Sequence, residues 1–83
     1  MKSQVYDCTG REIKLGDIIS NSEGDVLVVG YEYGAFGADI VPEFAEKYET
    51  RTGFYPFINF IGFRRDYYHG YFYLMNFKVV GKA

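Results

Sequence analysis

The residues best able to do chemistry form a compact run of cations and tyrosines in the C-terminal third of the chain. Arginine pairs with phosphate or carboxylate groups, and tyrosine rings stack on bases or pack at the centres of protein interfaces. The run consists of Arg64, Arg65, Tyr67, Tyr68, Tyr71 and Tyr73. Residues 54–77, which contain it, hold eleven of the seventeen aromatic side chains. This pattern predicts either an oversized aromatic core or a binding surface.

Catalytic groups are scarce by comparison. Cys8 and His69 are the only cysteine and the only histidine, and Asp66 is the acid that could orient the histidine. Cys8 lies within a turn sequence and His69 lies beside a glycine, so we interpret both as ordinary loop residues. One cysteine and one histidine also cannot complete a zinc site without carboxylates. We therefore expect a protein that is not an enzyme and that uses neither a metal nor another cofactor.

The charged residues are unevenly distributed, although the net charge is only −2. Residues 17–49 carry eight acids and one base, whereas residues 50–83 carry five bases and one acid. If the two segments lie on different faces, the molecule is dipolar and its field would steer a charged partner. If strands from both segments share one sheet, the opposite charges mix instead. The candidates for an acidic binding face are Asp39, Glu43, Glu46 and Glu49.

The elements that position these residues are predicted to be mostly short β-strands separated by turn sequences. Residues 25–33 form the clearest strand, because Val26 to Val29 favour β-structure, and this strand should be central. A turn at 34–37 precedes a short strand over 38–41. Pro42 suits the first position of a helix, which we expect to remain short and to lie near residues 42–48.

The aromatic stretch is predicted to form two long strands over residues 54–63 and 71–80, joined by residues 64–70. Apolar side chains alternate onto both faces of each strand, as happens when a sheet curls or meets a partner. The phenylalanines expected to build a core without disulfides are Phe57, Phe60, Phe63, Phe72 and Phe77.

Together these elements predict a single, mainly β domain over residues 1–83. Five to seven short strands suggest a small, strongly bent antiparallel sheet, which we interpret as an SH3-like barrel. Gly16 and Asp17 support this interpretation, because a glycine can take the tight turn into a barrel strand while the aspartate bonds nearby amides. The single cysteine fits a reducing compartment, and no apolar run is long enough to cross a bilayer. We expect a cytoplasmic protein that does not enter a membrane.

Three segments of the chain resemble the YopX-like proteins of phages and prophages. They are Asp7-x-x-Gly10-Arg11-Glu12-Ile13-x-x-Gly16-Asp17-Ile18-Ile19, then Tyr31-Glu32-Tyr33-Gly34-Ala35-Phe36-Gly37, and finally Phe77-Lys78-Val79-Val80-Gly81. The resemblance covers about half the chain. Lys82 stands where the family usually has asparagine, and residues 54–73 have no counterpart that can be placed. The resemblance implies a phage-encoded β-barrel in the cytoplasm of a host cell, with no settled activity.

Three functional hypotheses remain open from the sequence. The first is a protein-binding protein, in the form of a homodimer or of an inhibitor of a host or defence protein, whose acidic face could meet a basic groove. The alternative is a barrel that binds single-stranded nucleic acid through Arg64, Arg65 and the neighbouring tyrosines, against which the low net charge argues. A further alternative is a sponge for a nucleotide-type ligand, held between stacked tyrosines at a subunit boundary.

Overall fold

The computed structural model describes residues 3–50 and 53–83. Its strands are β1 (Val5–Asp7), β2 (Asp17–Ser20), β3 (Val26–Glu32), β4 (Ala35–Asp39), β5 (Phe54–Pro56), β6 (Phe63–Asp66), β7 (Tyr71–Leu74) and β8 (Lys78–Lys82). A short helix, α1 (Pro42–Ala45), follows β4, and a 3₁₀ turn, η1 (Phe57–Asn59), follows β5. The described residues therefore form a mainly β protein with one short helix, as predicted.

The larger of two sheets has five strands in the order β5-β4-β3-β2-β8, and every neighbouring pair is antiparallel. β3 lies at its centre, which confirms the prediction from Val26 to Val29. The turn from β3 to β4 is tighter than expected: Tyr33 and Gly34 both have positive φ, so that β4 already begins at Ala35. Two successive positive φ values are typical of the two-residue turns that join antiparallel strands.

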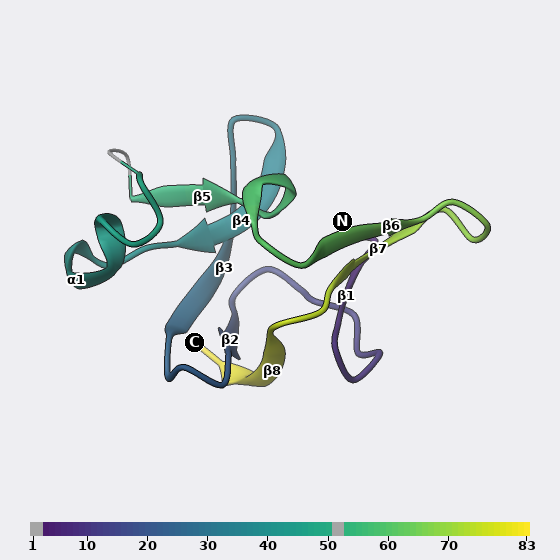
Figure 1. Cartoon of the computed structure of the whole chain (residues 1–83), viewed down its shortest axis with the longest axis horizontal. Helices are drawn as coiled ribbons and strands as arrows, with labels where there is room; N and C mark the ends of the chain where they lie inside the picture. The colour runs from purple at the N-terminus through teal and green to yellow at the C-terminus, as the bar shows by residue number, and fades with distance from the viewer. Residues whose placement is uncertain (1–2, 51–52) are drawn as a thin grey trace.

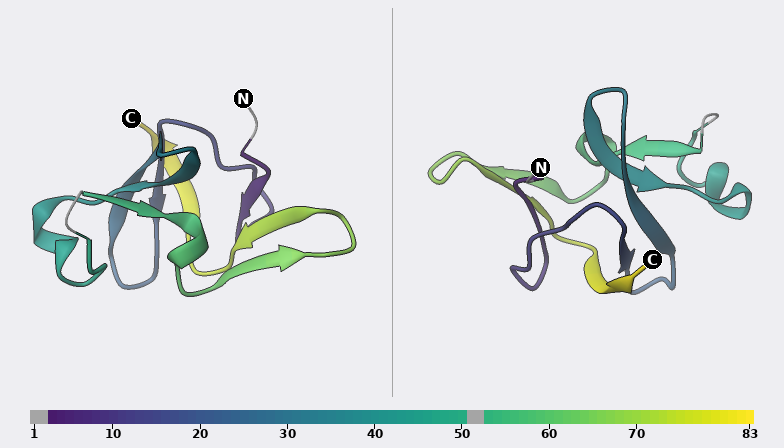
Figure 2. Two further views of the ribbon diagram at one scale, coloured as in Figure 1. Left: turned by 90° about the horizontal axis from the view of Figure 1, so that it is seen from above. Right: turned by 180° about the vertical axis from the view of Figure 1, so that it is seen from behind.

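The smaller sheet has three strands in the order β1-β7-β6. β6 and β7 form an antiparallel hairpin, and β1 runs parallel to β7. We call residues 63–74 the arm. Figure 1 and Figure 2 show that its tip projects beyond the rest of the molecule, and that α1 lies at the opposite end of the longest axis.

The two long aromatic strands predicted over 54–63 and 71–80 are wrong. Each is broken in its middle: β5 ends at Pro56 and passes into η1, and β7 ends at Leu74, before the turn that leads to β8. Gly62, with φ of +88°, turns the first segment into the arm. The strand pairing gives two sheets and does not show a closed barrel.

The core lies against the five-stranded sheet and contains three of the five phenylalanines expected there. Phe57, Phe60 and Phe77 are buried, whereas Phe63 and Phe72 are half-buried and pack on the edge of the core. Phe54 is buried as well, and the other residues of the core cluster are aliphatic: Val5, Ile13, Ile19, Leu27, Val29, Ala38, Ile40 and Leu74. No helix in the described part of the chain is both long and apolar enough to cross a membrane.

Candidate functional site

The arm carries all six residues that the sequence singled out, but it divides them between two faces. Residues paired across an antiparallel ladder share a face, and successive residues of a strand alternate. Arg64 pairs with Tyr73, and Arg65 pairs with Phe72. The two arginines therefore point to opposite sides of the arm.

One face of the arm is a cluster of tyrosines. Tyr6 of β1 lies in register with Tyr73, and their ring centroids are 5.8 Å apart. The Tyr6 ring also meets Tyr71 edge to face at 5.1 Å. Arg64, which is exposed, belongs to this face by its pairing with Tyr73. Tyr6, which the sequence did not single out, completes the cluster.

The other face combines stacked phenylalanines with a cation. The rings of Phe63 and Phe72 stack at 5.2 Å with an interplanar angle of 15°. The guanidinium carbon of Arg65 lies 5.6 Å from the Phe72 ring and 5.1 Å from the Tyr67 ring, within the range of a cation–π contact. A small apolar cavity of about 210 Å³ lies at the base of this face, beside Phe36, Phe57 and Ile58.

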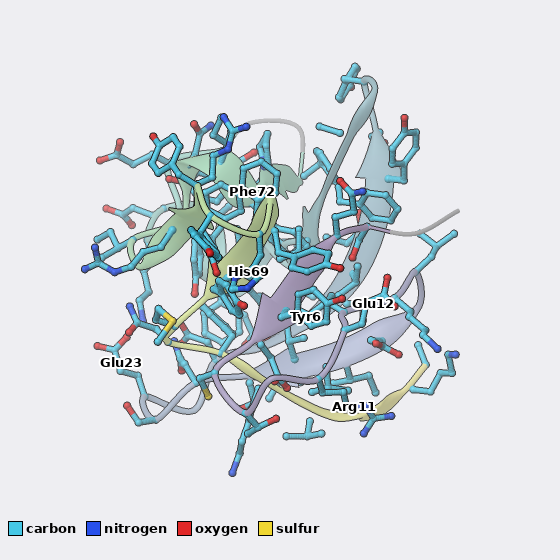
Figure 3. All side chains as sticks on the ribbon, turned by 90° about the vertical axis from the view of Figure 1, so that its right-hand side faces the viewer. Tyr6, Arg11, Glu12, Glu23, His69 and Phe72 are labelled. Carbon is cyan, nitrogen blue, oxygen red and sulfur yellow. The ribbon has the colours of Figure 1, made fainter. Side chains whose placement is uncertain are left out.

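The tip of the arm is held in shape by Asp66. Its carboxylate accepts hydrogen bonds from the backbone amides of Tyr68 and His69 and lies 2.8 Å from Nδ1 of His69. The contact with His69 is the main reason that the pKa of Asp66 falls below its ordinary value. Tyr67 and Tyr68 are 84% and 91% exposed. Figure 3 looks at the molecule from the side of the arm, with His69 at the tip.

Asp66 does contact His69, but Cys8 lies at a different part of the fold. The backbone amide of Cys8 bonds to the carbonyl of Phe77, beyond the C-terminal end of β7, whereas His69 precedes the other end of that strand. The structure therefore does not assemble a nucleophile and a base from these two residues. No cluster of three or more His, Cys, Asp or Glu side chains suited to a metal occurs among the residues that the structure describes.

The acidic candidates lie at the end of the molecule opposite the arm. Asp39 ends β4, Glu43 belongs to α1, and Glu46 and Glu49 lie on the turns that follow, all four exposed. The arm with its two arginines is at the other end of the longest axis (Figure 1). The charges of the two segments nevertheless mix in the larger sheet, because β8 pairs with β2 and places Lys82 opposite Asp17.

A second candidate site, which the sequence did not indicate, is a groove of about 750 Å³. It lies between the β2–β3 turn, the segment after α1, the loop after η1 and the turn between β7 and β8. Its wall includes the half-buried rings of Tyr48 and Tyr55, with the buried rings of Phe60 and Phe77 beside them. A volume of this size is within the range of small-molecule sites in proteins.

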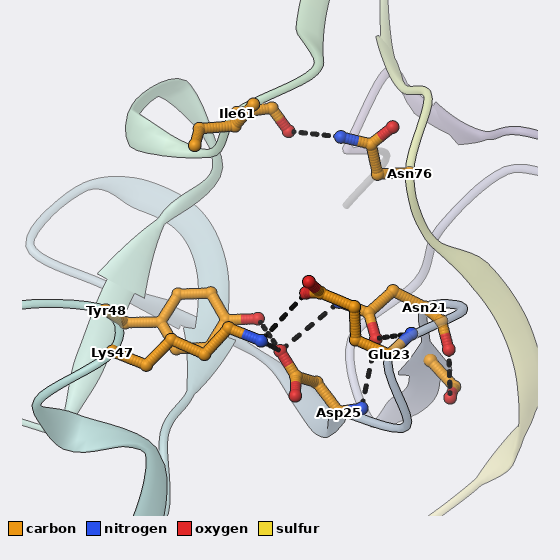
Figure 4. A network of polar contacts seen from close by, with 8 residues as sticks. Asn21, Glu23, Asp25, Lys47, Tyr48, Ile61 and Asn76 are labelled. Atoms are coloured by element: carbon orange, nitrogen blue, oxygen red, sulfur yellow. Dashed lines mark hydrogen bonds and ion pairs between the residues drawn. The ribbon is translucent and has the colours of Figure 1, made fainter.

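One wall of the groove is fixed by a polar network around the buried carboxylate of Asp25 (Figure 4). Its Oδ2 accepts hydrogen bonds from Lys47 Nζ at 2.7 Å, the Tyr48 hydroxyl at 2.6 Å and Asn21 Nδ2 at 3.2 Å. Burial alone would raise the pKa of Asp25, but these donors outweigh it and lower the pKa. Burial and the bond to Asp25 raise the pKa of Tyr48, which stays protonated.

Lys47 also reaches Glu23, with Nζ 2.8 Å from Oε2. Its bonds to Asp25 and Glu23 raise the pKa of Lys47, so the ammonium form is favoured. The sequence held one signal for this network, because Lys47 is the only base in residues 17–49. Its partners could not be identified from the sequence, since they lie more than twenty positions away.

The opposite wall of the groove is held in place by the side-chain amide of Asn76. Asn76 donates a hydrogen bond from Nδ2 to the carbonyl of Ile61, at 3.1 Å, and so ties the loop after η1 to the turn after β7 (Figure 4). Ile61 and Met75, which line this wall, are 89% and 47% exposed.

A scan against protein-family models, a search of curated proteins and a search of solved structures found no match for this chain.

Proposed function

We propose that this chain is a non-enzymatic interaction protein that binds a protein partner through the arm. The observation that carries the proposal is the exposure of Tyr67 and Tyr68, 84% and 91%, on an arm that projects from the body of the molecule. Monomers rarely leave several large rings together in solvent, and tyrosine and arginine are the side chains most enriched at the energetic centres of protein interfaces.

The arm also offers such a partner more than one kind of contact. The stacked rings of Phe63 and Phe72 border the small apolar cavity, which suits a partner's apolar side chain. Arg65, held over Phe72 and Tyr67, can pair with an acidic group beside that side chain. The Asp66 bonds fix the tip, which lowers the entropy lost on binding.

Single-stranded nucleic acid is the alternative occupant of the arm, and the two faces argue against it. Nucleic-acid affinity depends on a continuous basic surface that follows the phosphates. Arg64 and Arg65 point to opposite sides of the arm, so that each face carries one arginine. The net charge of −2 adds no general attraction for a polyanion.

The finer features of the proposal rest on the resemblance to YopX-like proteins. On that basis the chain is phage-encoded, acts in the cytoplasm of a host cell and inhibits a host or defence protein, whose basic groove would meet Asp39, Glu43, Glu46 and Glu49. We also retain the SH3-like barrel as a proposal. In its favour, the five strands of the larger sheet are all antiparallel to their neighbours, and β8 pairs with β2, so the last strand of the chain lies beside the first strand of that sheet.

A homodimer formed through the arm is the simplest form of this proposal to test. Light scattering at several concentrations would measure the mass of the protein in solution. The variant Tyr67→Asn/Tyr68→Asn removes the exposed rings, and Tyr33→Asn is the control, because Tyr33 is 81% exposed but lies on the β3–β4 turn. Asparagine also tolerates the positive φ of Tyr33. We expect the arm variant to be monomeric and the control to match the wild type.

A monomeric wild type would restrict the proposal to a different protein partner. Affinity capture from host cells should then retain a protein on the wild type and on Tyr33→Asn but not on the arm variant. Binding to a single-stranded oligonucleotide, lost steeply as salt rises and lost in the arm variant, would overturn the proposal in favour of nucleic acid.

A further inference from the structure

We propose that the groove between Tyr48, Tyr55 and Lys78 binds a planar aromatic anion of the size of a mononucleotide. This site is separate from the arm, and the proposal does not depend on the arm's function. The sequence suggested a nucleotide-type ligand at a subunit boundary, whereas the groove is formed within one chain.

The first requirement of such a ligand, an apolar wall for a ring, is met by aromatic side chains. Tyr48, Tyr55 and Phe60 form one cluster, with ring centroids 5.1 to 5.7 Å apart. Tyr48 and Tyr55 are its half-buried members, so they present ring surface to the groove. Their hydroxyls are already bonded to Asp25 and to the carbonyl of Asn59, which leaves the rings as their contribution to binding.

The groove is also formed in advance of binding. The Asp25 network fixes the wall that carries Tyr48, and the Asn76 bond to Ile61 fixes the wall across from it (Figure 4). The absence of a side chain at Gly62 lets the chain pass close to Asn76, because a Cβ atom at that position would lie 2.6 Å from Asn76 Nδ2. A site that needs little ordering loses less affinity to conformational entropy.

One exposed lysine of the groove can meet an anionic group. Among the charged side chains that line the groove, Glu23 and Lys47 form an ion pair with each other. Lys78 is exposed, and within the described part of the chain no ion pair of its own is found for it. Lys47 also bonds the buried Asp25, so Glu23, Asp25 and Lys47 together carry a formal charge of −1 and the groove with Lys78 is close to neutral; Lys78 is the cation left to meet a single phosphate or carboxylate group.

The groove also offers a hydrogen-bond acceptor to the polar edge of such a ligand. Asn76, which lines the groove, uses Nδ2 to bond Ile61, and no hydrogen bond to its side-chain carbonyl is found among the described residues, so this oxygen remains an acceptor. A nucleotide has a ring, polar ring edges and a phosphate, and therefore uses the tyrosines, Asn76 and Lys78 at once. A simple apolar molecule would use only the first of these.

The test compares AMP, adenosine and ribose 5-phosphate as probes of the full chain, by titration followed in two-dimensional NMR. Lys78→Ala removes the cation, and Lys82→Ala is the control, because Lys82 is an exposed lysine of the same strand that does not line the groove. We expect AMP to bind about tenfold more tightly than adenosine, and Lys78→Ala to abolish most of that difference. Lys82→Ala should leave it unchanged.

A second pair of variants blocks the groove without using the lysine. Ile61→Asp places an acid on the groove wall, and Ile58→Asp is the control, since both isoleucines are more than 70% exposed but Ile58 lies outside the groove. AMP binding should weaken in the first variant alone. The proposal is overturned if none of the probes binds at about 10 mM, well above ordinary ligand affinities, if ribose 5-phosphate binds as tightly as AMP, or if Lys82→Ala weakens binding as much as Lys78→Ala.

Discussion

The carboxylate of Asp7 accepts a hydrogen bond from the backbone amide of Val79 at 2.8 Å, although 72 positions separate the two residues. Asp7 ends β1 of the three-stranded sheet, and Val79 belongs to β8 of the five-stranded sheet. The other oxygen of the same carboxylate accepts bonds from the Thr9 amide, the Thr9 hydroxyl and the Arg11 amide. One buried side chain therefore orders the turn after β1 and joins the two sheets.

Replacement of this carboxylate should weaken the whole fold. In Asp7→Asn the side-chain amide would turn a donor toward backbone N–H groups, and the remaining bonds would lose their charge. Hydrogen bonds to a charged group contribute about 1.5–3 kcal/mol each, so we expect the free energy of unfolding to fall by about 2–4 kcal/mol. Urea denaturation measures it, with the exposed Glu32→Gln as a control that should change stability by less than about 0.5 kcal/mol. An equal effect of both variants would contradict this role.

The pH dependence of stability should follow from Asp7 and Asp25. Burial raises the pKa of each carboxyl, but hydrogen-bond donors outweigh burial, so that both pKa values lie below the ordinary value in the folded state. At pH values well above about 3.9, the ordinary pKa of an aspartate, both carboxyls are ionised in folded and unfolded chains and their stabilisation is complete. As pH falls from there through the folded pKa values, the unfolded state binds more protons and stability is lost.

We therefore expect the midpoint of urea denaturation to be constant near neutral pH and to fall steeply below about pH 4. Asp7→Asn should show a shallower fall, because one of the two titrating groups is gone. A midpoint that rises on acidification would show that the two carboxyls are not stabilised as anions.

Much of the five-stranded sheet could be predicted because local chemistry decides it. Gly16 has φ of +85°, and Asp17 accepts the backbone amide of Lys14 at 2.8 Å, as expected from the Gly-Asp sequence. Pro42 begins α1, where its fixed φ and missing N–H are suited to the first turn. Each of these features depends on residues that are close together in the sequence.

The structure of residues 54–77 could not be predicted as well, because their pattern of apolar side chains is compatible with more than one structure. Apolar residues on both faces of 54–63 fit a long buried strand, but they equally fit a strand, a 3₁₀ turn and a loop whose rings all turn inward. The choice depends on Gly62 and on the distant Asn76. The separation of Arg64 from Arg65, by contrast, could have been expected, since successive strand residues point to opposite faces.

The groove was missed for a related reason. Its walls come from several segments that are far apart in the sequence, and the Asp25 network connects residues 21 to 25 with residues 47 and 48. In the sequence these residues look like a turn and a solvated acidic helix. Their buried bonds become visible only when the segment after α1 folds back over the β2–β3 turn.

The hydroxyl of Tyr48 should contribute to that folding. Tyr48→Phe keeps the ring but removes the 2.6 Å hydrogen bond to Asp25. Because Asp25 is charged and buried, we expect a loss of about 1–3 kcal/mol in the free energy of unfolding. The pKa of Asp25 should rise toward its ordinary value, which an NMR titration of its carboxyl would show. Tyr33→Phe, on an exposed turn, is the control. An unchanged Asp25 pKa would mean that Lys47 and Asn21 hold the carboxylate without the hydroxyl.

The close packing of β4 against β5 gives the sharpest prediction for the larger sheet. A Cβ atom on Gly37 would lie 2.5 Å from the carbonyl oxygen of Tyr55 and 2.8 Å from the Cα of Pro56. These are backbone atoms of the paired strand, so β5 would have to move, and with it the chain that leads into η1. We expect Gly37→Ala to cost at least about 3 kcal/mol.

Gly81→Ala is the matched control for Gly37→Ala. Gly81 also lies in a strand of the same sheet, but no atom lies within 4 Å of a Cβ built there, and its φ is not positive. Its replacement should leave the free energy of unfolding within about 0.5 kcal/mol of the wild type. Thermal and urea denaturation of both variants would measure the difference. Equal stabilities would mean that β5 can shift without cost, and that the register between Gly37 and Pro56 does not determine how η1 and the arm are placed.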